Sequence, residues 1–276
     1  TLIEKRDGVQ KNLKEKVGMF KVRAGLNFSA FFEYANPVKE ISLFGIKINN
    51  LTIKSAGAMV DAFIKSGRPH FIATPNPEII IAAQNDNELK KTINSADLCL
   101  PDGMGVLAAS KFLKIPLLER VTGVDLMLEI LRSAKEKGYK VFLLGSAPGV
   151  AEDAARKLPG VNIAGIHHGY FKDADEKEVI EKIKHSRPDV LFVGLGAPRQ
   201  EFWTAKHYKH LGVPVCMVIG GSLDVISGKA KRAPEIVQKL GGEWFYRLIK
   251  EPKRWKRQLK LVEFMLMAAK RKLFYR

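Results

Sequence analysis

Residues 140–158 read KVFLLGSAPGVAEDAARKL, an apolar run that passes through a glycine-containing turn into a helix-period segment. A buried strand leading directly into a helix is the building unit of a parallel sheet with crossover helices. In addition to Lys140–Leu144, similar apolar runs predict strands at Phe71–Ala73, Leu98–Leu100, Asn162–Ile166, Val190–Gly194 and Val215–Ile219. The predicted fold class is therefore α/β, a Rossmann-like parallel sheet with flanking helices.

Helix-period segments separate these strands, and the chain divides into three predicted parts. We expect helices at Pro77–Ala96, Gly123–Lys137, Gly149–Leu158, Asp175–His185 and Arg199–Leu211. Residues 1–39 have no clear period and are predicted to form an N-terminal extension. Residues 40–246 form the main domain, and residues 247–276 form a basic helical appendage.

Polar and glycine residues follow each predicted strand. They occupy residues 74–76, 101–103, 145–146, 167–170, 194–200 and 220–222. In an open parallel sheet the loops at the carboxyl ends of the strands share one edge, where ligands bind. Any single loop is better explained as a simple turn, but the set as a whole predicts one binding crevice.

Two of these turns suggest a nucleotide diphosphate. Gly145 and Ser146 follow one strand and Gly196 follows another, and each turn leads into a helix whose N-terminal N–H groups attract phosphate. Neither turn is a GxGxxG fingerprint or a P-loop. Gln200 and Glu201 come next and would hydrogen-bond a ribose or a base edge, although Glu201 fits helix capping equally well.

Asp102, between Pro101 and Gly103, is a candidate general base at a strand end. The structural alternative for an isolated Asp-Gly pair is an Asx-turn. Thr74 and Asn76 offer neutral hydrogen bonds to sugar hydroxyls or an acetamido group. Arg120 suits a phosphate, or an ion pair with Asp125.

The net charge of +17 is concentrated in the appendage, where 11 basic residues face 2 acidic ones, whereas residues 40–246 hold 27 basic and 23 acidic residues. A nucleic-acid-binding body would carry its own basic stripe, so nucleic acid is not a predicted partner. The apolar run 261–269 between basic flanks is typical of a helix lying on an anionic membrane. The alternative is a helix packed on the body, and apolar surface of this kind would also allow self-association.

Several classes of protein are disfavoured by composition. Two cysteines exclude a disulfide scaffold. No apolar run is long enough to span a bilayer, and we expect no secretory leader. These two features predict a cytoplasmic protein.

Asp173 and Asp175 have a metal-ligand spacing but fit N-capping better, and His167 and His168 would point apart on a strand. We predict no metal and no cofactor.

The motifs TPN (74–76), PDG (101–103), RVTGVD (120–125), GAPRQEFW (196–203), GGSLD (220–224), SG (227–228), RAP (232–234), EWFYRL (243–248) and EP (251–252) resemble the WecG/TagA/CpsF glycosyltransferase family in their order. The resemblance covers about residues 41–257. It implies an inverting transferase that moves a sugar from a UDP-sugar to a polyprenyl-diphosphate-linked acceptor at the inner face of the cell membrane. In one branch the donor is UDP-N-acetylmannosamine, the acceptor is N-acetylglucosaminyl-diphospho-undecaprenol, and the product is the linkage disaccharide of wall teichoic acid.

The resemblance also implies roles for individual residues. Asp102 would be the base, Thr74 and Asn76 sugar-site residues, and Tyr170 and Asp224 contacts of the nucleotide, with Arg120 and Gln200 lining the site. Arg247, Arg254 and Arg257 would bind the departing diphosphate or the acceptor diphosphate, since arginine can neutralise this charge without a metal. Three alternatives remain open: a family member using UDP-N-acetylmannosaminuronic acid or a UDP-hexose, a dinucleotide-dependent oxidoreductase, and a non-enzymatic adaptor.

Overall fold

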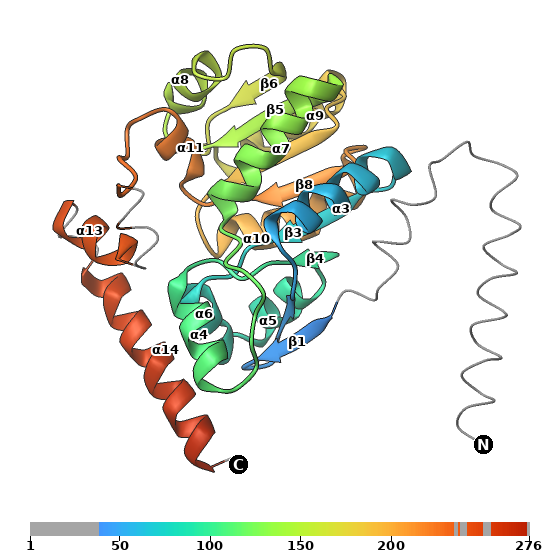
Figure 1. Cartoon of the computed structure of the whole chain (residues 1–276). Coiled ribbons are helices and arrows are strands. Elements are labelled where there is room, and N and C mark those ends of the chain that lie inside the picture. The colour runs from blue at the N-terminus through green and yellow to red at the C-terminus, as the bar shows by residue number, and fades with distance from the viewer. Residues whose placement is uncertain (1–38, 235–236, 238–241, 251–254, 275–276) are drawn as a thin grey trace, which may run out of the picture. The chain divides into compact units, whose positions relative to one another are not determined.

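The computed structural model describes residues 39–234, 237, 242–250 and 255–274 (Figure 1). The chain divides into two units, Thr1–Pro37 and Val38–Arg276, and the described residues belong to the second. The predicted N-terminal extension lies outside the described residues, except for Lys39.

A six-stranded parallel sheet forms the centre of the second unit. The strands are β3 (His70–Ala73), β4 (Leu98–Cys99), β5 (Lys140–Gly145), β6 (Asn162–His167), β7 (Val190–Gly194) and β8 (Val215–Val218), in the order β4-β3-β8-β7-β5-β6. All six predicted strands are confirmed to within one residue at either end, and so is the α/β fold class.

Helices cover both faces of this sheet because successive strand residues alternate between two apolar clusters. In β5, Phe142 and Leu144 belong to the first apolar cluster, on one face of the sheet, and Val141 and Leu143 belong to the second, on the other face. The second cluster is covered by α3 (Ile53–Ser66), α7 (Gly123–Lys137), α8 (Val150–Arg156) and α11 (Ser222–Ile226). The first is covered by α4 (Pro77–Asn85), α5 (Asn87–Asn94), α9 (Glu176–Ser186) and α10 (Arg199–His207).

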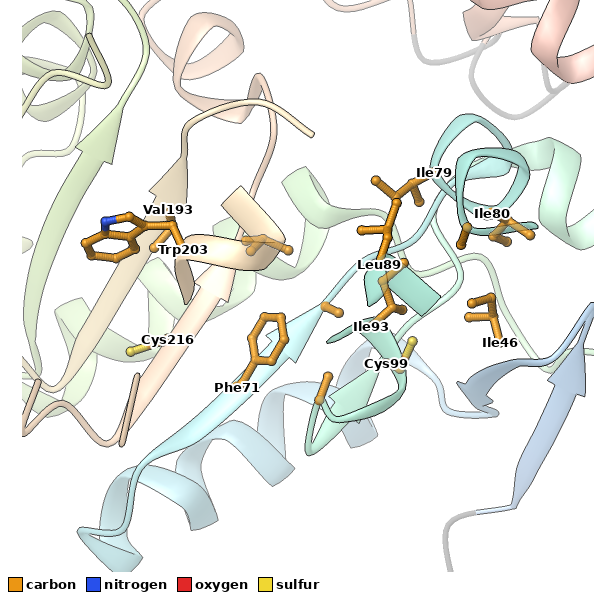
Figure 2. Packing of buried hydrophobic residues seen from close by; sticks show 14 of the residues in the cluster. Ile46, Phe71, Ile79, Ile80, Leu89, Ile93, Cys99, Val193, Trp203 and Cys216 are labelled. Atoms are coloured by element: carbon orange, nitrogen blue, oxygen red, sulfur yellow. The ribbon is translucent and has the colours of Figure 1, made fainter. Parts of the chain in front are cut away.

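The first cluster joins the sheet to helices that are far apart in the sequence. Figure 2 shows Phe71 of β3 between Trp203 of α10 and the apolar side chains of α4 and α5. Phe71 is fully buried, as are the thiols of Cys99 and Cys216, and burial raises the pKa of the Cys99 thiol to about 12. These cysteines are therefore inert parts of the core.

The predicted helix Pro77–Ala96 is wrong in one respect, because the structure divides it into α4 and α5. Asp86 ends the first helix and caps the second, where its Oδ1 accepts a hydrogen bond from the Leu89 N–H at 2.9 Å. The predicted helix Arg199–Leu211 is also shorter and passes at Tyr208 into the 3₁₀ turn η2 (Tyr208–His210).

An antiparallel hairpin that the sequence patterns did not reveal precedes the sheet. Strands β1 (Glu40–Leu43) and β2 (Ile46–Asn49) are joined by Phe44 and Gly45, both with positive φ as such two-residue turns require. Ile46 and Ile48 are fully buried, and β2 packs against β4 and α5.

The C-terminal region forms α13 (Glu243–Lys250) and α14 (Trp255–Phe274), and α14 runs beside α4 and α6 (Met104–Phe112) (Figure 1). Phe264 and Ala268 are fully buried on the inner side of α14. Its outer side carries a row of apolar side chains, each more than half exposed, which we call the apolar row: Trp255, Leu259, Val262 and Leu266. Within the described residues, none of the helices is both long enough and apolar enough to cross a bilayer.

Candidate functional site

Thr74 and Asp102 meet at the N-terminus of α7. A Cβ placed on Gly123, the first residue of that helix, would lie 3.2 Å from Thr74 Oγ1 and 3.6 Å from Asp102 Oδ2. A side chain at this position would contact both groups, and the Thr74 hydroxyl would have to shift by a few tenths of an ångström. The positive end of a helix stabilises a nearby carboxylate by about 0.3–1 kcal/mol. The structure thus brings together the predicted base and a predicted sugar-site residue, and it adds Gly123, which the sequence patterns had not singled out.

Asn76 and Arg120 flank this cluster. Asn76 is the N-cap of α4, and its Oδ1 accepts a hydrogen bond from the Ile79 N–H at 3.0 Å. Its amide oxygen therefore has a structural role in addition to the predicted sugar contact. Arg120 is half-buried in the segment between α6 and α7. Asp125, its alternative partner, forms an ion pair with Arg232 at 2.7 Å.

Glycines lie at or just after the carboxyl ends of β5, β7 and β8 and allow their backbones to approach each other closely. A Cβ on Gly145 would collide with the Gly194 carbonyl oxygen, and a Cβ on Gly194 would come within 2.8 Å of the Gly220 carbonyl oxygen. The ends of β5, β7 and β8 therefore approach each other backbone to backbone. Around Gly196, in contrast, the space for a Cβ is open. A backbone surface without side chains is the kind of floor that accommodates a phosphate.

Ser146 and Asp224 lie together at this floor. Ser146 has a positive φ of 56°, which is uncommon for a residue other than glycine. Its N–H donates to the Gly194 carbonyl oxygen at 3.0 Å, and its hydroxyl donates to Asp224 Oδ2 at 3.3 Å. Backbone strain of this type is concentrated at functional sites.

Tyr170 is presented to solvent by a loop that Arg199 holds. The Tyr170 side chain is 75% exposed, whereas its neighbour Phe171 is buried. The guanidinium of Arg199 donates to the carbonyl oxygens of Gly169 and Phe171, both at 3.0 Å, and lies over the Phe171 ring. Arg199 belongs to the GAPRQEFW motif, but no role was predicted for it from the motif.

Gln200 connects α10 to the end of β8 and is itself buried. Its Oε1 accepts a hydrogen bond from the Gly220 N–H at 3.1 Å, and its Nε2 donates to Glu201 Oε1 at 2.9 Å. Glu201 is 5% exposed, and within the described part of the chain its Oε2 has no hydrogen-bond partner. Burial raises the pKa of the Glu201 carboxyl to about 7, although the hydrogen bond from Gln200 opposes this rise.

The raised pKa of Glu201 predicts a pH-dependent stability. The folded state holds the Glu201 proton more tightly than the unfolded state does, and this difference contributes to the free energy of unfolding. The contribution is complete below the ordinary pKa of 4.5 and is lost as the pH rises through about 7. The glutamine in E201Q does not titrate. The free energy of unfolding of E201Q minus that of the wild type should therefore increase by up to about 3 kcal/mol when the pH is raised from about 4 to about 8. Chemical denaturation at both pH values measures this change, and an equal difference at both would contradict it.

The group formed by Thr74, Asp102 and Gly123 is joined across the sheet to the glycine-lined ends of β5, β7 and β8. Helix α14 lies at the edge of the Thr74–Asp102 group. Thr74 Oγ1 donates to the Val218 carbonyl oxygen at 3.4 Å, which connects β3 to β8. The Leu261 side chain of α14 lies against Gly105 and Pro77, which adjoin the Asp102 and Asn76 loops. Arg254 lies outside the described residues. Arg247 and Arg257 belong to α13 and α14, but their side chains are outside the description.

The residues weighed as metal ligands have other contacts. Asp175 Oδ2 accepts from the Lys172 N–H at 3.2 Å, which closes the 3₁₀ turn η1 (Asp173–Asp175). Its side chain makes no cap hydrogen bond to α9, the helix whose capping the sequence favoured. The prediction that His167 and His168 point apart is wrong: β6 ends at His167, and the two rings lie 4.6 Å apart. Across the described residues, no group of three or more His, Cys, Asp or Glu side chains is arranged to hold a metal ion.

Comparison with known proteins identifies the class. Residues 41–276 match the glycosyl transferase WecG/TagA/CpsF family. The chain is 40% identical over 213 residues to an N-acetylglucosaminyldiphosphoundecaprenol N-acetyl-beta-D-mannosaminyltransferase of Bacillus spizizenii, which covers 75% of this chain and 82% of that protein. It is 38% identical over 246 residues to a protein of the same name from Staphylococcus aureus, covering 87% and 96% respectively. The chain belongs to the WecG/TagA/CpsF family of glycosyltransferases, as the order of its motifs indicated.

Proposed function

We propose that this protein transfers N-acetylmannosamine from UDP-N-acetylmannosamine to N-acetylglucosaminyl-diphospho-undecaprenol, the step that makes the linkage unit of wall teichoic acid. The observation that carries the proposal is the convergence of Asp102, Thr74 and the α7 N-terminus beside a glycine-lined set of strand ends. The names of the Bacillus and Staphylococcus relatives supply the acceptor and the transferred sugar.

Asp102 acts as the general base in this proposal. Its carboxylate accepts the proton of the acceptor hydroxyl as that oxygen attacks the anomeric carbon of the donor. The bond between this carbon and the UDP oxygen breaks in the same step, so the configuration inverts and UDP leaves. The Thr74 hydroxyl lies near the Asp102 carboxylate at Gly123 and suits a sugar hydroxyl or acetamido group.

The diphosphate of the donor is assigned to the glycine-lined strand ends. Gly145 and Gly196 provide a backbone surface without side chains, and Ser146 is held there by its N–H bond to the Gly194 carbonyl oxygen. Asp224 and the exposed Tyr170 suit the ribose and the base. Gln200, buried and bonded to Gly220, fixes the shape of this floor. Negative charge grows on UDP as it leaves, and Arg120, Arg247, Arg254 and Arg257 are the proposed cations that offset it.

Turnover of a panel of donors tests the proposal. The purified protein is incubated with a short-chain N-acetylglucosaminyl-diphospholipid and with UDP-N-acetylmannosamine, UDP-N-acetylmannosaminuronic acid or UDP-glucose, and the disaccharide product is measured. We expect product from the first donor and less than about one hundredth as much from the others, given the discrimination that pocket contacts supply. Faster turnover of either other donor would replace the proposed substrate by that sugar.

We also propose that the protein is peripheral, on the cytoplasmic face of the membrane that carries its acceptor. The apolar row on α14 lies on the side of the helix opposite Phe264 and Ala268, which are buried. The appendage carries 11 basic residues. An exposed apolar stripe combined with basic residues is the composition of an interfacial helix on anionic lipid.

Substitution within the apolar row should release the protein from membranes. V262E/L266E places two carboxylates at positions that are 56% and 60% exposed, so folding should be unaffected. We expect at least tenfold weaker co-sedimentation with phosphatidylglycerol vesicles. K270E produces the same change in net charge at an exposed position outside the row and should lose much less binding. Equal losses in the two variants would show that charge alone drives binding.

A further inference from the structure

Asn49 and Asn50, at the end of the β1–β2 hairpin, are the most deeply buried amide side chains of this hairpin region, with 3% and 7% exposure. Buried amides are retained in proteins when their hydrogen-bonding groups are satisfied. Each of these two side chains makes one bond as acceptor and one as donor. The two amides are directed to different segments of the chain.

Asn49 holds the edge strand β4. Its Oδ1 accepts from the Cys99 N–H at 2.7 Å, and its Nδ2 donates to Glu40 Oε1 at 3.2 Å. Because β4 is two residues long and pairs with β3 alone, the Asn49 amide takes the place of a second neighbouring strand. Asp102 follows Cys99 by three residues, so this bond fixes the base of the Asp102 loop.

Asn50 holds the segment that leads to Arg120. Its Oδ1 accepts from the Leu118 N–H at 2.7 Å, and its Nδ2 donates to the Pro116 carbonyl oxygen at 3.2 Å. A third bond, from the Ile53 N–H to Glu119 Oε2 at 2.9 Å, adds to this attachment. Arg120 follows Leu118 by two residues.

The hairpin that carries both asparagines is itself fixed to the body. Ile46 and Ile48 are fully buried, and the Lys47 N–H donates to Asn94 Oδ1 of α5 at 2.8 Å. One dipeptide on a rigid support therefore holds both the loop of the proposed base and the loop of a proposed cation. A displacement of about 1 Å in a reacting group can cost about a hundredfold in rate.

We propose that Asn49 and Asn50 are positioning residues for sugar transfer, which set the Asp102 loop and the Arg120 loop relative to each other. This inference rests on the proposed function, because it takes Asp102 and Arg120 as members of the reaction site. Neither asparagine touches a reacting atom, so their removal should lower kcat and leave binding at the β5, β7 and β8 ends unchanged.

The test compares N49A, N50A and N94A in the full-length protein. Asn94 is a matched control, because it also makes one acceptor and one donor bond to the same hairpin, to the Lys47 N–H and to the Gly45 carbonyl oxygen, but none to the two loops. With UDP-N-acetylmannosamine and a short-chain N-acetylglucosaminyl-diphospholipid, we expect kcat to fall 10- to 100-fold in N49A and N50A and less than threefold in N94A. The Kd for UDP should stay within twofold of the wild type in all three.

The outcomes separate this inference from the proposed function. The positioning role is overturned if N49A and N50A keep the wild-type kcat, or if N94A loses as much kcat as they do. It is also overturned if the loss of UDP affinity in N49A and N50A matches their loss of kcat. If an alanine variant does not fold, N49L or N50L replaces it, since leucine keeps the side-chain volume but neither the bond from the Cys99 N–H nor the bond from the Leu118 N–H. A kcat within threefold of the wild type in both leucine variants overturns the inference. D102N is assayed in parallel, and a fully active D102N contradicts the proposed base whatever the asparagine variants do.

Discussion

D102N is expected to lower kcat for sugar transfer by about a thousandfold, within the range that a general base contributes. The amide has nearly the shape of the carboxylate but cannot accept the proton of the acceptor hydroxyl. The Kd for UDP should be unchanged, because the proposed nucleotide floor is built from the ends of β5, β7 and β8. Product formation under saturating substrates, together with UDP titration, measures the two effects separately.

D86N is a suitable control for D102N. It makes the same chemical change at the N-cap of α5, where asparagine caps as well as aspartate does. We expect D86N to keep wild-type kcat and nearly wild-type Tm. A D102N variant with more than about one tenth of wild-type kcat would show that another group, or solvent, removes the proton.

The second large effect is expected from R254A/R257A, which should lower kcat by about a hundredfold or more, as the loss of groups that stabilise developing charge does. Residue 257 is four positions before Leu261 on α14, and Leu261 lies against Pro77 and Gly105 beside the Asn76 and Asp102 loops. These two arginines are therefore proposed to serve the reaction as well as the membrane. The assay uses a water-soluble acceptor analogue without membranes, so that membrane binding cannot affect the rate.

Substitution is a sharper test of the appendage than its deletion. Truncation after Tyr246 is expected to abolish transfer and leave UDP binding intact, but it would also uncover the apolar surface that Phe264 and Ala268 cover. K270A/K272A is the matched control, because it removes the same charge from the far end of α14 at two exposed positions. An equal loss of kcat in this control would contradict a specific role for Arg254 and Arg257.

Much of the fold could be predicted because the sheet is parallel and buried. Its strands are short apolar runs that end at a glycine or are followed two residues later by a glycine or proline, which favours strands over helices. The hairpin and the break at Asp86 could not be predicted in the same way. Strand β2 packs against α5 and β4, and the Phe44 ring contacts the ring of Phe264 on α14, all distant in sequence. Asp86 lies in the polar run 84–88, and the helical spacing of the apolar residues on either side does not show that Asp86 starts a second helix.

The candidate site was predictable as a set of loops, but the function of each side chain within it was not. Asn76 and Gln200 were selected as ligand contacts, and the structure shows that both also bond to the backbone of this chain, at Ile79 and Gly220. Arg199 and Asn50 received no role from the sequence, because their partners are carbonyl oxygens and N–H groups of distant segments. A side chain's partner depends on which backbone groups the fold leaves unpaired nearby.

The order of the strands along the chain, the family and the concentration of basic charge in residues 247–276 could be read from the sequence alone. The sequence also predicted the edge of the sheet that we propose as the binding site. The strands and the charge distribution follow from local periodicity and composition, and the family follows from the order of the motifs; none of these requires long-range contacts. Only the tertiary structure decided that Asp102, Thr74 and Gly123 meet, that α14 lies beside the Asp102 loop, and that Asn49 and Asn50 hold two loops at once. Such contacts join residues up to about two hundred positions apart in the chain, and packing of the whole core selects them.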